Sequence, residues 1–380
     1  TARSRSPWVE RVRALCRSCG GYRAMLFHCR AWWRPKESGV LGRLDRVSSV
    51  SGGSIIAAVL GLAWQDLKFV DGRSDLLQDL LVAPIRKMAR TNVDVRSVLW
   101  GAMIPGLTIS GRVAAIYDKV LFKGKTLQDL PEEGGPRFVI NACNVATGAL
   151  WRFSRPYMAD WRVGRWCDPE VRLAVAVAAS SAFPPVLSPT RLRPGRAPNE
   201  KYELAKPPYT TRVTLTDGGV YDNLGLETAY KRYGTLLVSD GGAPFSPQPR
   251  PKGDWARHVY RVLSLIDNQV RSLRKRQLIG AYKNQLRGGA YWGIGSHIAD
   301  FHVNDTFNYL DPDGPDWKAT RRLAAFETRL RCVPEPMQRA LINWGYVLCH
   351  TALAAHASAD LQRDHAITVK PAEGLPYPDG

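Results

Sequence analysis

The sequence predicts an α/β domain in which helices cover both faces of a sheet, followed by a helical C-terminal extension. From residue 11 to residue 240, short apolar runs alternate with segments of helical period, a pattern typical of such a sheet. Hydrophobic residues make up 45% of the chain and charged residues 23%, which excludes a disordered, collagen-like or disulfide-scaffold protein. The 380 residues leave room for two domains, or for one large domain with an extension.

The α/β domain is expected to span residues 1–245. Gly, Asp or Ser clusters bound each of its five predicted strands, at residues 12–17, 46–50, 138–145, 213–216 and 235–239. Between them, Gly and Pro break helical stretches at residues 76–89 and 111–121. We therefore expect residues 68–136 to form a helical insertion beside the sheet, as a candidate lid.

Residues 246–380 are expected to form the helical C-terminal extension. Four prolines between residues 243 and 253 mark its start, and the helical pattern then predicts helices at 255–283, 317–331 and 335–356. In the first of these, apolar residues recur at three- and four-residue steps while most basic residues fall elsewhere. The basic face is either a solvated surface or a surface that lies against anionic lipid.

The charge of the chain points to an anionic partner. Lys and Arg number 53 against 34 Asp and Glu, a formal net charge of +19, which attracts nucleic acid, anionic lipid headgroups or acidic substrates. No recognisable nucleic-acid module accompanies this charge, so we expect no nucleic-acid partner. No apolar run is long enough to span a bilayer. The seven scattered cysteines favour reduced thiols and a cytoplasmic protein, and the lone Cys16/Cys19 pair lacks the further ligands of a metal site.

The most informative stretch is residues 44–54 (LDRVSSVSGGS), which leads from a predicted strand into an apolar helix. Ser51 lies at the apex of this tight turn, where the helix dipole favours negative charge on its oxygen. Gly52 and Gly53 leave room for a substrate to approach, whereas Ser49 replaces the usual first glycine of a nucleophile elbow. The alternative is a turn that only connects strand to helix.

A serine nucleophile needs a base. Asp217 follows a predicted strand in an Asp-Gly-Gly turn, and burial there would raise the pKa of its carboxyl group. Asp240 precedes two glycines in the same way, so spacing alone leaves both carboxylates open. A histidine base is a third reading, and six histidines follow Asp217: His258, His297, His302, His350, His356 and His365.

A third glycine turn follows the first predicted strand, at Gly20 and Gly21. Backbone N–H groups in such a turn point outward together and can stabilise an oxyanion. A nucleotide phosphate loop would need a G-x-G-x-x-G or G-K-[ST] pattern, and neither is present. A plain connecting turn is the other reading.

Taken in order, the turn GGYRA (20–24), the elbow SVSGGS (49–54) and DGGVYDN (217–223) resemble the motifs of the patatin-like phospholipase family. The resemblance implies a three-layer α/β/α sandwich that hydrolyses lipid acyl esters through a Ser/Asp dyad, without metal or cofactor. On this resemblance Ser51 matches the nucleophile and Asp217 the base, which demotes Asp240. The oxyanion element matches Gly20, Gly21, Tyr22 and Arg23, and the supporting turns match Gly52, Gly53, Gly218 and Gly219.

The resemblance also extends to residues 179–185 (ASSAFPP), which are expected to shape the pocket floor. Cys19 replaces the first residue of the family's triple glycine, and its Cβ is expected to narrow or shift the oxyanion turn. We therefore expect a cytoplasmic enzyme that acts on a lipid ester and associates peripherally with anionic membranes. The alternative is an inactive relative that binds anionic membranes through its basic surface; oligomeric state and headgroup preference stay open.

Overall fold

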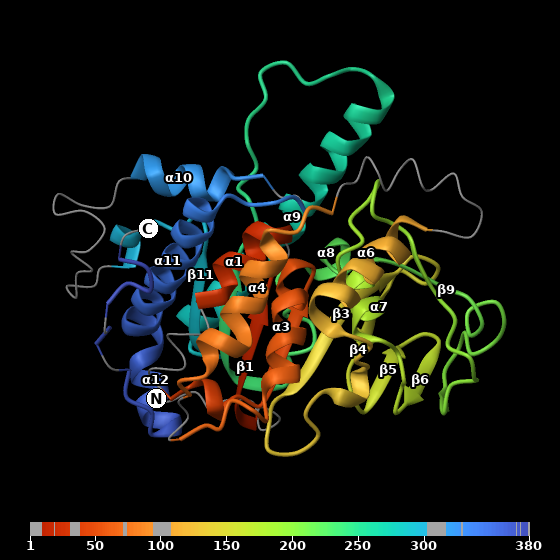
Figure 1. Ribbon diagram of the computed structural model, residues 1–380, viewed down its shortest axis with the longest axis horizontal. Coiled ribbons are helices and arrows are strands. Elements are labelled where there is room, and N and C mark those ends of the chain that lie inside the picture. The colour runs from red at the N-terminus through yellow and green to blue at the C-terminus, as the bar shows by residue number, and fades with distance from the viewer. Residues whose placement is uncertain are drawn as a thin grey trace.

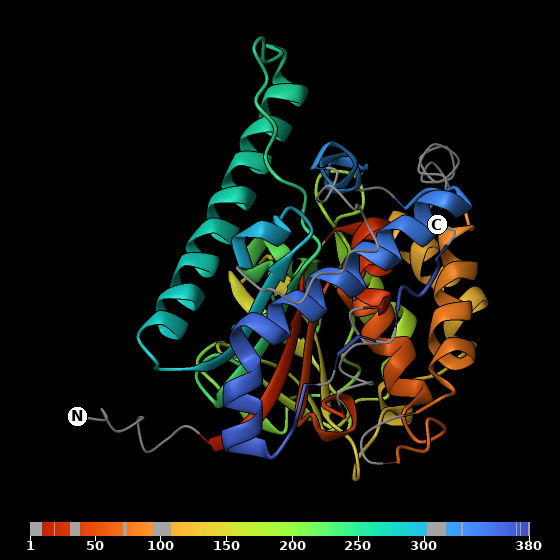
Figure 2. The ribbon, with the colours of Figure 1, turned by 90° about the vertical axis from the view of Figure 1, so that its left-hand side faces the viewer.

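A central sheet lies between two layers of helices in the computed structural model (Figure 1). The structure describes residues 10–18, 20–30, 39–70, 74–93, 108–301, 317–327, 330–369, 371–372 and 374–378. Helix α9 lies on one face of the sheet, and α1, α3 and α4 lie on the other (Figure 2). The predicted α/β sandwich with a helical C-terminal segment is confirmed.

The helices and strands have the following bounds. The strands are β1 Glu10–Arg17, β2 Arg46–Val50, β3 Arg137–Asn144, β4 Ala149–Phe153, β5 Tyr157–Asp160, β6 Gly164–Cys167, β7 Thr190–Leu192, β8 Glu200–Lys201, β9 Val213–Asp217, β10 Tyr233–Asp240 and β11 Gly288–Gly293. The helices are α1 Gly21–Arg30, α3 Gly52–Ala63, α4 Ala83–Ala89, α6 Ile109–Tyr117, α7 Leu173–Ser180, α8 Gly219–Asp222, α9 Trp255–Lys283, α10 Trp317–Ala325, α11 Glu335–Ala352 and α12 Ser358–His365. The five predicted strands are all present, with ends shifted by at most two residues.

Alternate residues of the central strands serve the two helix layers, as the pleat of a strand requires. In β1, Leu15 packs into the larger core with α1 and α3, whereas Ala14 and Cys16 face the smaller core. Leu278 of α9 closes that smaller core. Because both faces of the strand are covered, its central residues 14–16 are apolar on both sides, which is typical of a parallel sheet.

The sheet order is β11-β10-β1-β2-β3-β4-β5-β6-β8, and its strands run parallel from β11 to β3. Beyond β3 they are antiparallel. Strand β9 also pairs with β3, in the antiparallel direction. Since β4 occupies one edge of β3, β9 lies along the other edge, beyond Val50, where the pairing with β2 ends. The carboxyl ends of β2 and β9 therefore meet head to head along one edge of β3.

The segment beyond residue 245 contributes to this sheet and its core. Strand β11, which the sequence did not predict, pairs parallel with β10. Helix α11 packs so closely on α1 that a Cβ at Gly345 would lie 2.0 Å from the carbonyl oxygen of Phe27. Trp344 also donates a hydrogen bond to the carbonyl of Ile294 at 2.8 Å. The division of the chain at residue 245 stays a prediction.

The described part of the 68–136 insertion packs into the same fold. Helix α6 lies against α7, and α4 lies against α1 and α3. The side chains of Met88, Tyr117 and Phe122 are fully buried. Residues 71–73 and 94–107 of the insertion lie outside the described residues, so its lid function stays a prediction. Among the helices that the structure describes, none is both long and apolar enough to span a bilayer.

Candidate active site

Ser51 connects β2 to α3 in a conformation that non-glycine residues rarely adopt, with φ 53° and ψ −123°. Such backbone costs about 1 to 3 kcal/mol and persists only where its surroundings fix it. Here close packing fixes it: a Cβ at Gly52 would lie 2.2 Å from the carbonyl oxygen of Gly21, and one at Gly53 would lie 2.8 Å from Cβ of Arg17. The elbow is thus pressed against the turn that follows β1.

A buried network of hydroxyl groups holds the elbow from below. Ser180 accepts a hydrogen bond from the Ser51 N–H at 2.9 Å and donates one to the carbonyl of Asn141 at 2.7 Å. Its Oγ lies 2.9 Å from that of Ser54, which in turn donates to Ser49. Sequence reasoning did not find this network, and its one signal was the pair of serines that ends the alanine-rich helix α7.

Asp217, at the end of β9, is fully buried beside the elbow. Its Oδ1 accepts the N–H of Gly219 at 2.7 Å, whereas Oδ2 makes no hydrogen bond of ordinary geometry with any described residue. Burial raises the pKa of this carboxyl from 3.8 to about 7, and the opposing hydrogen bonds come from the Gly219 N–H and the Ser51 side chain. A Cβ at Gly218 would lie 2.4 Å from the carbonyl oxygen of Asn141, so this turn also needs glycine. The structure brings Ser51 and Asp217 together.

The glycine turn after β1 lies against the same serine. Gly20 has φ 146° and Gly21 has φ 57°, values in the region that favours glycine. Gly21 begins α1 and contacts Gly52, which begins α3, so the positive ends of two helix dipoles converge at Ser51. The N–H groups of Gly20 and Gly21 have no acceptor among the described residues. Cys19, expected to alter this turn, lies outside them.

The side chains of Tyr22 and Arg23 anchor the turn. Arg23 donates to the carbonyl of Gly241 through Nε at 3.2 Å and Nη2 at 3.0 Å, and through Nη1 to that of Phe326 at 2.6 Å. Tyr22 is fully buried in the core. The guanidinium of Arg23 therefore holds α1 in place through these carbonyl groups.

The rival carboxylate lies elsewhere. Asp240, at the end of β10, accepts hydrogen bonds from the Tyr291 hydroxyl at 2.8 Å and from the Gly242 N–H at 2.9 Å. Strand β1 separates β10 from β2. No described histidine contributes to the pKa of Asp217, and His302 lies outside the described residues.

Tyr117, at the end of α6, is a further residue of the site that sequence reasoning missed. Burial raises the pKa of its phenol, the Asp217 charge adds to the rise, and the Ser181 hydroxyl opposes it. The insertion therefore places a neutral phenol close to the carboxylate. No local sequence signal marks this residue, because the contact depends on how α6 docks on α7.

Solved structures offer distant matches. Human GIVD cytosolic phospholipase A2 is 14% identical with a TM-score of 0.41, over 64% of this chain and 49% of that chain. The same protein in complex with methyl gamma-linolenyl fluorophosphonate is 15% identical with a TM-score of 0.42, over 63% of this chain and 44% of that chain. VipD from Legionella pneumophila is 16% identical with a TM-score of 0.38, over 91% of this chain and 67% of that chain. The chain thus spans about half the length of these phospholipase A2 structures.

A search of curated proteins gave no match. The sequence model of the family described as patatin-like phospholipase matches residues 15–230, a range that includes all three glycine-rich motifs. This range is more than half of the chain, and the protein therefore belongs to the patatin-like phospholipase family.

Proposed function

We propose that this protein hydrolyses acyl esters of lipids, with Ser51 as the nucleophile and Asp217 as its base. The observation that carries the proposal is a serine in a strained elbow beside a buried carboxyl group whose pKa is near 7. Among the described residues, Oδ2 of that carboxyl has no hydrogen-bond partner of ordinary geometry, which leaves it available to Ser51. Membership of the family supports the reaction class.

The reaction proceeds in two half-reactions. Asp217 takes the proton of Ser51 as Oγ attacks the ester carbonyl, and the tetrahedral intermediate then expels the alcohol, which receives this proton. The resulting acyl-enzyme is hydrolysed by water, which gives a proton to Asp217 as its oxygen attacks the acyl carbonyl. Asp217 then returns this proton to Oγ of Ser51 as the fatty acid leaves. A pKa near 7 suits a group that must both accept and return a proton at neutral pH.

The turn at Gly20 and Gly21 supports the transition state. Its N–H groups have no described acceptor and adjoin the elbow through Gly52, so they are suited to bind the oxyanion. One such hydrogen-bond donor is typically worth about 3 to 4 kcal/mol of barrier. The converging ends of α1 and α3 favour the same negative charge.

The first half of α9 supports binding to an anionic membrane surface. It projects from the body of the protein (Figure 2) and exposes apolar and aromatic side chains, with Trp255 81% exposed and Tyr260 and Ile266 each 51% exposed. Arg257 and Arg261 lie on the same half, and the chain carries a formal net charge of +19. Apolar insertion combined with basic attraction is how interfacial helices bind anionic bilayers, where a phospholipid substrate resides.

Substitution of the two proposed catalytic residues should separate them from the rival carboxylate. We expect Ser51→Ala to abolish ester turnover and labelling by a fluorophosphonate probe, and Asp217→Asn to lower kcat by about 10² to 10⁴-fold. Asp240→Asn is the matched control and should keep turnover near that of the wild type. Labelling of a different serine in peptide maps, or a larger loss in Asp240→Asn than in Asp217→Asn, would contradict the assignment.

The pH dependence should follow the carboxyl group of Asp217. The base works only when ionised, so kcat/KM should rise about tenfold per pH unit below about pH 7 and level off above it. Between pH 3.8 and about 7 the folded state keeps a proton that the unfolded chain has released, so the free energy of unfolding falls as pH rises. Asp217→Asn should therefore be more stable than wild type at pH 8 and about equally stable at pH 4. A value of kcat/KM that stays constant from pH 5 to 8 would refute the role of Asp217 as the base.

The strain at Ser51 should appear in the stability of inactive variants. Both Ser51→Gly and Ser51→Ala remove the hydroxyl, but only glycine also removes the Cβ that makes φ 53° unfavourable. The strain energy that glycine relieves should exceed the free-energy cost of ordering its more flexible unfolded chain. We therefore expect the free energy of unfolding in urea to be about 1 kcal/mol higher for Ser51→Gly than for Ser51→Ala. A less stable glycine variant would mean that the elbow is unstrained.

Co-sedimentation with vesicles tests the role of α9. The double variant Trp255→Ser/Ile266→Ser should bind vesicles of anionic phospholipid less than wild type, with unchanged turnover of a soluble ester. Val145→Ser, which changes an exposed apolar residue on the β3–β4 turn, should bind like wild type. High salt should weaken wild-type binding. Equal binding by all three proteins would exclude α9 as the membrane-binding element.

A further inference from the structure

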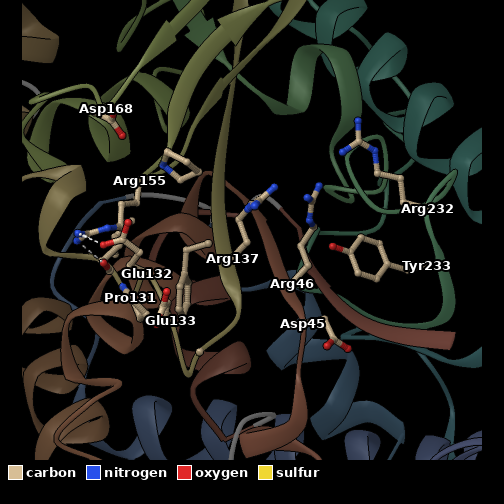
Figure 3. A pocket seen from close by; sticks show the side chains of 14 residues that line it. Asp45, Arg46, Pro131, Glu132, Glu133, Arg137, Arg155, Asp168, Arg232 and Tyr233 are labelled. Atoms are coloured by element: carbon tan, nitrogen blue, oxygen red, sulfur yellow. Dashed lines mark hydrogen bonds and ion pairs between the residues drawn. The ribbon is translucent and has the colours of Figure 1, made fainter. Parts of the chain in front are cut away.

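A polar cavity of about 790 Å³ opens at the end of the sheet opposite the candidate active site (Figure 3). It lies at the amino ends of β2, β3 and β10, whereas Ser51 follows the carboxyl end of β2. The length of β2 separates Arg46 from Ser51 by roughly 16 Å. The volume falls within the range of small-molecule sites, about 300 to 1,000 Å³.

Three arginines gather on one wall of this cavity. Arg46 and Arg137 are register partners on the neighbouring parallel strands β2 and β3, so their side chains lie on the same face, about 4.8 Å apart at the backbone. Arg232 precedes β10, and Figure 3 shows its guanidinium on the same side as the other two. Like charges directly side by side on a sheet are unfavourable unless an anion lies between them.

Arg46 is the buried member of this group, with 2% of its surface exposed. Its Nη1 donates to the carbonyl of Thr228 at 2.6 Å, and its guanidinium lies 5.1 Å from the ring centre of Tyr233. Its Nε has no hydrogen-bond partner among the residues that the structure describes. Within the described part of the chain, no carboxylate pairs with Arg46, Arg137 or Arg232. Burial lowers the pKa of Arg46, and the charges of Arg232 and Arg137 lower it further.

The fourth arginine of the cavity, Arg155, already has hydrogen-bond partners and an acidic partner. Arg155 donates to the carbonyls of Gln128 and Leu130 and pairs with Glu132 at 2.7 Å. Figure 3 places Glu132, Glu133 and Asp168 on this side of the cavity, away from the three arginines. Asp45, which lines the cavity below Arg46, is paired with Arg13: it accepts the backbone N–H of Arg13 at 2.7 Å and lies 3.5 Å from its Nε. The unneutralised positive charge is therefore confined to one wall.

We propose that this cavity binds a ligand through a phosphate group, held by Arg46, Arg137 and Arg232. Guanidinium groups match phosphate oxygens with paired hydrogen bonds, and three cations suit an anion that carries more than one charge. The phosphate belongs either to a free phosphorylated small molecule or to the headgroup of an anionic phospholipid. The proposal stands on the cavity and its arginines and does not depend on the Ser51/Asp217 reaction.

Titration with inorganic phosphate and pyrophosphate tests the site, with sodium chloride at matched ionic strength as reference. We expect both anions to raise the melting temperature of the wild type, and Arg137→Gln and Arg232→Gln each to weaken binding at least tenfold in calorimetry. Both residues are exposed, so these variants should fold. Without phosphate, Arg137→Gln should be at least as stable as wild type, because a like charge has been removed. Arg193→Gln, an exposed arginine outside the cavity, should respond like wild type.

Vesicles distinguish the two sources of phosphate. A double variant Arg137→Gln/Arg232→Gln that loses pyrophosphate binding but still binds phosphatidic acid vesicles points to a free phosphorylated ligand. Loss of vesicle binding in the same variant, with phosphatidylcholine vesicles as control, points to a headgroup. Wild-type protein labelled by a fluorophosphonate should still bind pyrophosphate, because the cavity is separate from Ser51. Full retention of both pyrophosphate and vesicle binding by the double variant would overturn the proposal.

Discussion

The meeting of β2 and β9 at one edge of β3 is the constraint on which the candidate active site depends. Val50 lies beside Asn141, and Asp217 lies beside the next residue, Ala142, so one step of about 3.3 Å along β3 separates the two strand ends. Backbone hydrogen bonds set this register. A slip of one residue in β9 would turn Asp217 to the opposite face of the sheet and away from Ser51. The pairing of hydroxyl and carboxylate therefore depends on the hydrogen-bonded register of the sheet.

Both ends of β2 carry an unfavourable arrangement that the sheet enforces. At its carboxyl end the backbone of Ser51 is strained, and it is held by the Ser180 hydroxyl and by close packing at Gly52. At its amino end the register places the buried Arg46 beside Arg137 without a described acidic partner. Conformations and charges of this kind concentrate at functional sites, where a ligand offsets their cost. One strand thus links the proposed catalytic site to the proposed phosphate site.

The sequence predicted the parts of this structure that depend on local pattern. Apolar runs predict the strands from β1 to β3, and a helical period predicts the helix α9. The glycines that follow Ser51 and Asp217 indicate the elbow and its base. Strand β11 begins with two glycines and reads as a loop, since only its pairing with β10 makes it a strand. The contacts of Ser180 and Tyr117, and the meeting of Arg46 with Arg137, arise between segments far apart in the sequence. No local pattern could reveal them.

The contact between Ser51 and Asp217 can be observed without any substrate. Infrared difference spectra recorded during a pH titration, with Asp217→Asn as the blank, report the protonated carboxyl group of residue 217. The wild type should lose this signal near pH 7, and Ser51→Ala should lose it at higher pH, because the serine side chain lowers the pKa of the carboxyl. The same titration midpoint in both proteins, or a carboxyl group already ionised at pH 5, would contradict the account.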